Sequence, residues 1–244
     1  MSTSHWHTRV KHWNNITPPL RPHTDSIAKQ IEIVGKDSER VLVLGMTPEL
    51  TQRFTNVTAV DREQVMIDHF WPGDTANKNA RLGNWMSLHF NEGPFTGIVG
   101  DGSLNMLYWP TDIKYLLDRL LDSYMKPNAV LAVRVFTRPD TPVSLDDVTA
   151  AIPTLPWHAW RCLLNMHIAD VEGTVIPSKR MLEKFNELFP DRDALCKQTG
   201  WSLEEISNSM DSYKNSTTTT SYPTRQELLS AIPSSARDIH FVDV

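Results

Sequence analysis

Residues 41–61, V-L-V-L-G-M-T-P-E-L-T-Q-R-F-T-N-V-T-A-V-D, decide the fold. The stretch opens with four apolar residues, which predict a strand that is buried on both faces. Gly45 ends that strand. T-P-E at residues 47–49 then predicts a helix start, because it joins a cap residue, a proline at the first helical position and an acid in the first turn. A second apolar run closes on Asp61. This order is typical of a nucleotide-binding half-domain, in which N–H groups of the turn face the ligand and the acid accepts the ribose hydroxyls.

The glycine spacing of this turn narrows the class of ligand. Asp61 follows Gly45 by 61 − 45 = 16 positions, somewhat under the ~20 of dinucleotide-binding folds. A G-x-G-x-x-G motif would need two further glycines, where this chain has Thr47 and Leu50. Because a pyrophosphate needs close approach of the backbone, the pattern disfavours NAD and favours a nucleoside without phosphates, such as S-adenosylmethionine.

Composition limits the partners of the chain. Its 244 residues, 40% of them hydrophobic, are enough for one sizeable core or a core with a helical appendage. The net charge is −5 and no basic block is present, so a nucleic acid is not a favoured partner. Two cysteines cannot form a disulfide framework, no apolar run approaches the ~20 residues of a membrane span, and the polar N-terminus is unlike a signal peptide. We therefore expect a cytoplasmic protein with no membrane partner.

The alternation of strand and helix patterns continues as far as residue 136 and then stops. The further predicted strands of this part are 80–83, 95–100 and 129–136, and a clear helix pattern covers 111–125. Residues 144–214 are mainly helical in pattern. After them, the β-branched run 216–221 and the final I-H-F-V-D-V, residues 239–244, predict two strands on either side of a helix that begins at a capping box.

Four local motifs resemble those of the class I S-adenosylmethionine-dependent methyltransferases. They are V-L-V-L-G (41–45), A-V-D (59–61), G-N-W (83–85) and F-T-G-I-V-G-D-G-S-L-N-M-L (95–107). In that family they lie under the methionine part of the cofactor, at the ribose, beside the adenine and at the methyl-donor end. Asn84 stands where the family usually has an acid, and its side-chain carbonyl can still accept from the exocyclic amine of adenine. The resemblance covers residues 24–136 well.

This resemblance implies a Rossmann-like α/β fold. Its seven-stranded, mostly parallel sheet would have helices on both faces and a helical insertion before the last two strands. The implied segments are an N-terminal lid (1–23), an S-adenosylmethionine-binding core (24–143), a helical insertion that caps the substrate (144–215), and a C-terminal strand, helix and strand that complete the sheet (216–244). The acceptor pocket under the cap would include Trp157, Trp160 and His167 and suit an aromatic or otherwise apolar small molecule.

The motifs and the strand ends together define candidate ligand contacts. The predicted cofactor-binding residues are Gly45, Met46, Thr47, Asp61, Arg62, Met66, Asn84, Trp85, Asp101, Gly102 and Ser103. The predicted substrate-binding residues are Trp13, Arg21, Asn105, Tyr108 and Arg134. Methyl transfer from a sulfonium depends chiefly on positioning, so the sequence need not display a catalytic base; His167 and Tyr108 are the candidates. We expect no metal site, because no carboxylate or cysteine cluster completes the N-terminal histidines.

Structural roles stay open for several of these residues. Asp61 has an alternative role as a cap of the next helix, and Met66 and Trp85 have one as core residues. Asp101 next to a glycine is also a turn former. Arg134 in an apolar strand needs a partner, which is either a core acid or an anionic substrate.

Three functions remain after these exclusions. The first is a methyltransferase that acts on a small-molecule methyl acceptor. The second is a non-catalytic methyltransferase-like module that regulates a partner, since the first motif has a single glycine. The third is an NAD-type oxidoreductase, which the glycine spacing opposes. The acceptor atom and the oligomeric state stay open, with a homodimer as one alternative.

Overall fold

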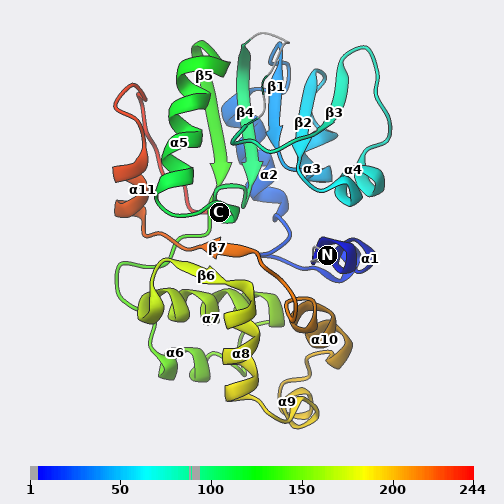
Figure 1. Cartoon of the computed structure of the whole chain (residues 1–244), viewed down its shortest axis with the longest axis vertical. Helices are drawn as coiled ribbons and strands as arrows, with labels where there is room; N and C mark the ends of the chain where they lie inside the picture. The colour runs from blue at the N-terminus through cyan, green and yellow to red at the C-terminus, as the bar shows by residue number, and fades with distance from the viewer. Residues whose placement is uncertain (1–4, 88, 90–93) are drawn as a thin grey trace. The chain divides into compact units, whose positions relative to one another are not determined.

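The computed structural model describes residues 5–87, 89 and 94–244 (Figure 1). The chain forms two compact units, each built from two separate stretches of sequence. We call Pro22–Val135 with Glu227–Val244 the sheet unit, and Met1–Arg21 with Phe136–Gln226 the helical unit. The motifs of residues 41–107 all belong to the sheet unit.

A parallel sheet of five strands forms the centre of the sheet unit, in the order β3-β2-β1-β4-β5 (Figure 1). Its strands are β1 (Val41–Leu44), β2 (Val57–Asp61), β3 (Lys78–Leu82), β4 (Phe95–Asp101) and β5 (Met125–Arg134). All four residues of β1 and all five of β2 are buried, as their apolar runs predict. Because the strands are parallel, the ends of β1, β2 and β4 that carry the motifs meet at one edge, here called the carboxyl edge.

Helices pack on the sheet through alternate residues of its strands. On one face, Leu42 of β1 and Ile98 of β4 share a buried cluster with Leu116 of helix α5 (Thr111–Arg119). On the other, helix α2 (Thr24–Val34) comes so close that a Cβ at Gly97 would lie 2.3 Å from Cγ1 of Val34. A glycine is therefore required at position 97 for this packing.

Short helices connect the strands. They are α3 (Pro48–Thr51), α4 (Gln64–Phe70), η2 (Leu104–Met106) and the π-helical turn η3 (Leu120–Tyr124). Helix α11 (Arg225–Ala231) follows the last strand, and its Ala231 joins the α5 cluster. The predicted helix after Gly45 is thus a single turn, with Pro48 at its first position as expected.

The helical unit carries the remaining elements. They are α1 (Trp6–Lys11), η1 (Trp13–Asn15), α6 (Leu145–Ala150), α7 (Trp157–Glu172), β6 (Val175–Pro177), α8 (Ser178–Leu188), α9 (Arg192–Thr199), α10 (Leu203–Asp211) and β7 (Thr219–Ser221). Its core contains a cluster of aromatic rings from α7 and α8, with Trp157 and Trp160 stacked at 5.8 Å between ring centroids. Trp157 is 2% exposed and Trp160 0%. The predicted acceptor pocket around these two rings is therefore wrong, because they fill the core of this unit.

The prediction of a seven-stranded sheet is also wrong, although the α/β architecture is confirmed. The β-branched run does form a strand, β7, but it pairs antiparallel with β6 in a separate two-stranded sheet. The final residues 239–244 are not a strand, and Ile239, Phe241 and Val242 are exposed. In the described ranges, no helix has the length and apolar character needed to cross a membrane.

Candidate functional site

The turn after β1 is held against the end of β2 by a glycine and an aspartate. Gly45 has a φ of +103°, a conformation that residues with a side chain rarely adopt. Its N–H donates to the Val60 carbonyl at 2.8 Å. The next N–H, of Met46, donates to Oδ2 of Asp61 at 2.9 Å. The first two motifs are thereby joined at the carboxyl edge.

Asp61 is buried, with 9% of its surface exposed. Its Oδ1 accepts from the Glu63 N–H at 2.9 Å, and Glu63 is the N-cap residue that precedes α4. Burial raises the pKa of Asp61, although the two backbone N–H groups oppose this shift. Each carboxylate oxygen has two lone pairs, so these two bonds leave acceptor capacity for further donors. Glu63, and not Asp61, is the N-cap residue of α4, so the predicted role of Asp61 as the helix cap is wrong. The bond that Asp61 accepts from the Glu63 N–H still leaves acceptor capacity for a ligand.

Trp85 completes this corner. Its indole N–H donates to the Val60 carbonyl at 2.8 Å. A Cβ built on Gly45 would lie 3.7 Å from Cζ2 of Trp85 and 3.9 Å from Oδ2 of Asp61. Arg119 of α5 fixes the segment by donating to the Trp85 and Met86 carbonyls at 3.1 and 2.8 Å. Gly45, Asp61 and Trp85 therefore meet around one point.

Asp101 and Arg134 end β4 and β5 opposite one another in the sheet register. Arg134 donates through Nε to Oδ1 and through Nη2 to Oδ2 of Asp101, the second bond at 2.9 Å. The two side chains are 7% and 11% exposed. Burial and the nearby Glu49 carboxylate raise the pKa of Asp101, while Arg134 opposes the shift. Of the two alternatives for Arg134, the structure shows the pairing with a core acid.

The other predicted cofactor contacts of the sheet unit mostly satisfy local backbone. Ser103 is buried and donates to the Leu44 carbonyl at 2.5 Å, while Gly102 donates its N–H to the Arg134 carbonyl at 2.9 Å. The side-chain carbonyl of Asn84 accepts from the Met86 N–H at 3.0 Å. The carbonyl that the sequence assigns to adenine thus uses one of its two lone pairs within its own turn.

The remaining predicted cofactor- and substrate-binding residues of the sheet unit differ in exposure. Thr47 and Met66 are buried, and Arg62 is half exposed beside Glu63. Asn105 is 2% exposed, and Tyr108 is 54% exposed. Exposure leaves Tyr108 accessible, whereas burial holds Asn105 in place.

Three predicted residues belong to the helical unit. Arg21 lies over the ring of Trp13 at 5.9 Å. His167 is 8% exposed, with Nδ1 2.8 Å from the Val143 carbonyl. The predicted ligand roles of these three residues stay predictions.

Two features of the sites were not found from the sequence. Arg119, which fixes the Trp85 turn, lies in a helix pattern with nothing local to mark it. A pocket in the helical unit joins residues near positions 10, 160 and 207. Such long-range contacts leave no signal in residue spacing.

Comparison with known proteins gives likenesses at the level of structure. No protein-family model matches the chain, and no curated protein sequence matches it. Many solved structures are similar, including several S-adenosylmethionine-dependent methyltransferases. The methyltransferase CcbJ from Streptomyces caelestis is 14% identical over 56% of this chain and 59% of its own, with a TM-score of 0.46.

Two further structures show the same level of similarity. The amino pentose methyltransferase CalS10 from Micromonospora echinaspora, with S-adenosylmethionine bound, is 15% identical over 53% of this chain and 56% of its own, at a TM-score of 0.42. The N-methyltransferase NodS from Bradyrhizobium japonicum, with S-adenosyl-L-homocysteine, is 12% identical over 53% and 71%, at 0.41. The chain spans less than two thirds of the CcbJ and CalS10 chains. At these identities and TM-scores the likeness carries no argument about activity.

Proposed function

We propose that the sheet unit binds S-adenosylmethionine at its carboxyl edge, and that the protein transfers the methyl group to a small molecule. The observation that carries this proposal is the corner formed by Gly45, Asp61 and Trp85. It offers a buried carboxylate with remaining acceptor capacity, next to a turn that only glycine adopts without strain.

The charge of the carboxyl edge suits this cofactor. Asp61 is buried there, the side chain of Asp101 is 7% exposed, and the Glu49 carboxylate is close enough to raise the pKa of Asp101. Arg134 neutralises one of these acids. A sulfonium carries one positive charge and the ribose offers two hydroxyl donors, so both complement an acidic edge. A pyrophosphate would meet like charge here, which disfavours the dinucleotide alternative.

Each part of the corner would have a separate task. Asp61 would accept the ribose hydroxyls through the lone pairs that Met46 and Glu63 leave unused. Gly45 would let the methionine part of the ligand approach the backbone, and Trp85 would form an apolar wall. S-adenosylmethionine itself supplies the electrophilic methyl group, so the protein contributes position and a dry site.

Calorimetric titration with S-adenosyl-L-homocysteine tests the proposal. We expect the wild type to bind, and Asp61→Asn to bind at least about tenfold more weakly, because a charge-assisted acceptor is lost. The matched control is Asp191→Asn. Asp191 also accepts a backbone N–H, that of Ala194 at 2.9 Å, but it does so at the start of α9 in the helical unit.

The control should fold and bind like the wild type, since asparagine also caps helices well. No heat of binding to the wild type, or equal affinity of Asp61→Asn and Asp191→Asn, would refute the proposed site. Binding without methyl transfer to any small acceptor would instead favour the non-catalytic module.

A further inference from the structure

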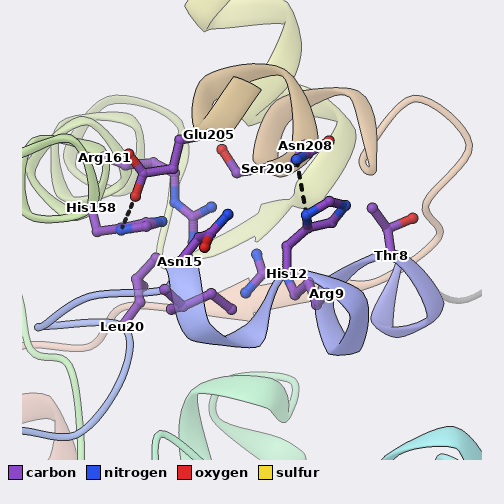
Figure 2. Close-up of a pocket in the computed structure, with 11 residues that line it drawn as sticks. Thr8, Arg9, His12, Asn15, Leu20, His158, Arg161, Glu205, Asn208 and Ser209 are labelled. Carbon is purple, nitrogen blue, oxygen red and sulfur yellow. Dashed lines mark hydrogen bonds and ion pairs between the residues drawn. The ribbon is translucent and has the colours of Figure 1, made fainter. Parts of the chain in front are cut away.

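A pocket in the helical unit is formed by the N-terminal segment together with α7 and α10 (Figure 2). Arg9, His12 and Asn15 come from the N-terminal segment, Arg161 from α7, and Glu205 from α10. Every residue that lines it belongs to the same compact unit. The pocket is thus a property of that unit alone.

Arg161 is the unusual residue of this pocket. It is 2% exposed, yet it forms no hydrogen bond or ion pair with any residue that the structure describes. Its contact is with the ring of Tyr213, 5.9 Å from the guanidinium carbon. Arg138 of the same unit shows the usual arrangement, with Nη1 2.9 Å from Oδ1 of Asp170. A buried guanidinium without an anion is costly, and an anion in the pocket would offset that cost.

Arg9 adds positive charge to the same place. Its Nη2 donates to the hydroxyl of Tyr213, while its Nε has no partner among the described residues. Burial alone would raise the pKa of the Tyr213 hydroxyl, but the charges of Arg161 and Arg9 bring it below its ordinary value. Both guanidinium groups lie against the same ring, since the Arg9 and Arg161 guanidinium carbons are 5.4 and 5.9 Å from the Tyr213 ring centroid.

The remaining titratable groups of the pocket do not neutralise these charges. Burial, with the charges of Arg161 and Arg9, lowers the pKa of His158 to about 3, so this ring is neutral. Its Nδ1 accepts from the Thr17 N–H at 3.2 Å, which places the proton on Nε2. Glu205 lies 3.5 Å from that Nδ1, but it forms no ion pair with Arg161 in the described structure. Nδ1 of His12 forms a hydrogen bond with the side-chain amide of Asn208 of α10 at 3.2 Å, and this bond involves no acid.

We propose that this pocket binds the oxyanion of a small molecule, a carboxylate or a phosphate group, through Arg161 with support from Arg9. A guanidinium matches the two oxygens of either group with paired N–H donors. Two arginines face a single acid, Glu205, so the lining carries a surplus of positive charge. The proposal does not depend on the methyltransferase function, since none of its residues lies in the sheet unit.

Thermal unfolding of the whole chain in sodium phosphate, sodium acetate and sodium chloride at equal ionic strength tests this proposal. Phosphate, acetate or both should raise the unfolding midpoint more than chloride does, because an anion that binds the folded state stabilises it. Phosphate also stabilises folded proteins in general, because it is excluded from their surface. A response to phosphate that Arg161→Gln loses therefore identifies a phosphate site, and a response to acetate that this variant loses identifies a carboxylate site. An equal effect of all three salts overturns the proposal.

Variants then separate the pocket from the rest of the surface. Arg161→Gln loses the guanidinium, so it should need at least about tenfold more anion for the same rise in the unfolding midpoint. Glu205→Gln loses the one acid of the lining, so it should need about tenfold less. Arg180→Gln is the matched control, because Arg180 of α8 is held at the surface by Glu172 and Glu187. It should respond like the wild type.

The unfolding midpoint without added anion shows whether a variant has simply lost structure. Because Arg161 has no anionic partner, Arg161→Gln should leave this midpoint unchanged or raise it. An anion response equal to that of wild type in Arg161→Gln overturns the proposal. So does a lowered ligand-free midpoint of Arg161→Gln together with an unchanged anion response of Glu205→Gln, since Arg161 would then be a structural group.

Discussion

The carboxyl edge of the sheet and the pocket of the helical unit differ in whether their buried arginine is paired with an acid. At the edge, Arg134 is bound by both carboxylate oxygens of Asp101, and acids outnumber the cation. In the pocket, Arg161 has no acid partner among the described residues, and cations outnumber the acid. A satisfied pair contributes to the fold, whereas an unsatisfied charge of the same type indicates a missing ligand.

The difference also assigns a ligand charge to each place. The acidic edge suits hydroxyl donors and a sulfonium, and the basic pocket suits an oxyanion. The two sites therefore make separate predictions, and each can fail without the other.

The largest expected effect comes from removing one partner of the satisfied pair. Arg134→Met leaves Asp101 buried without its cation, so we expect a loss of about 3–5 kcal/mol in the free energy of unfolding. Arg161→Met should be neutral or stabilising, because no acid loses a partner. Urea unfolding of the two variants beside the wild type measures the difference. An equal loss in the free energy of unfolding for both variants would mean that Arg161, like Arg134, has a structural partner.

The second prediction concerns the turn after β1. Gly45→Ala forces a side chain into a φ of +103°, which should cost about 1–3 kcal/mol and weaken S-adenosyl-L-homocysteine binding. Gly73 is the matched control, since it has a φ of +114° and nothing within 4 Å of a built Cβ. Gly73→Ala should therefore lose similar stability and no affinity. If Gly45→Ala keeps wild-type affinity, the ligand does not approach that turn.

These sites show which contacts residue patterns can predict. Gly45 and Asp61 lie in one continuous strand, turn, helix and strand, so local rules place them together. Asp101 and Arg134 are 33 positions apart and meet through the register of β4 and β5, which the pattern of either strand alone does not fix. Their pairing was therefore one alternative and not a conclusion.

The strand predictions at the C-terminal end fail for a related reason. The β-branched run 216–221 has a real preference for extended structure, and three of its residues form β7. Strand propensity does not predict which strand β7 pairs with, and its partner is the three-residue strand β6 in the helical unit. Residues 239–244 are mostly apolar, but they pair with no strand among the described residues and their apolar side chains stay exposed. The arginine pocket assembles segments about 150 and 200 residues apart, so no local pattern could predict it.

The smallest expected effect is a dependence of cofactor affinity on pH, and it distinguishes the two sites. Burial raises the pKa of Asp61 above its ordinary ~3.9, with Glu63 adding to the shift and Arg62 opposing it. Only the ionised carboxylate can accept both ribose hydroxyls. Affinity for S-adenosyl-L-homocysteine should thus be constant at neutral pH and fall by up to about tenfold per pH unit below the raised pKa.

The stability of the ligand-free protein should move the other way. Because the folded pKa of Asp61 lies above the unfolded one, the contribution of this group is full below the unfolded pKa and is lost as pH rises through the folded pKa. Parallel titrations and urea unfolding of wild type and Asp61→Asn between about pH 4 and pH 8 measure both trends. The variant should lack them. In the arginine pocket the ring of His158 stays neutral throughout that range, so His158 should add no pH dependence to the anion response. Cofactor affinity that falls equally in wild type and variant would assign the pH dependence to a group other than Asp61 and remove it from the proposed ribose site.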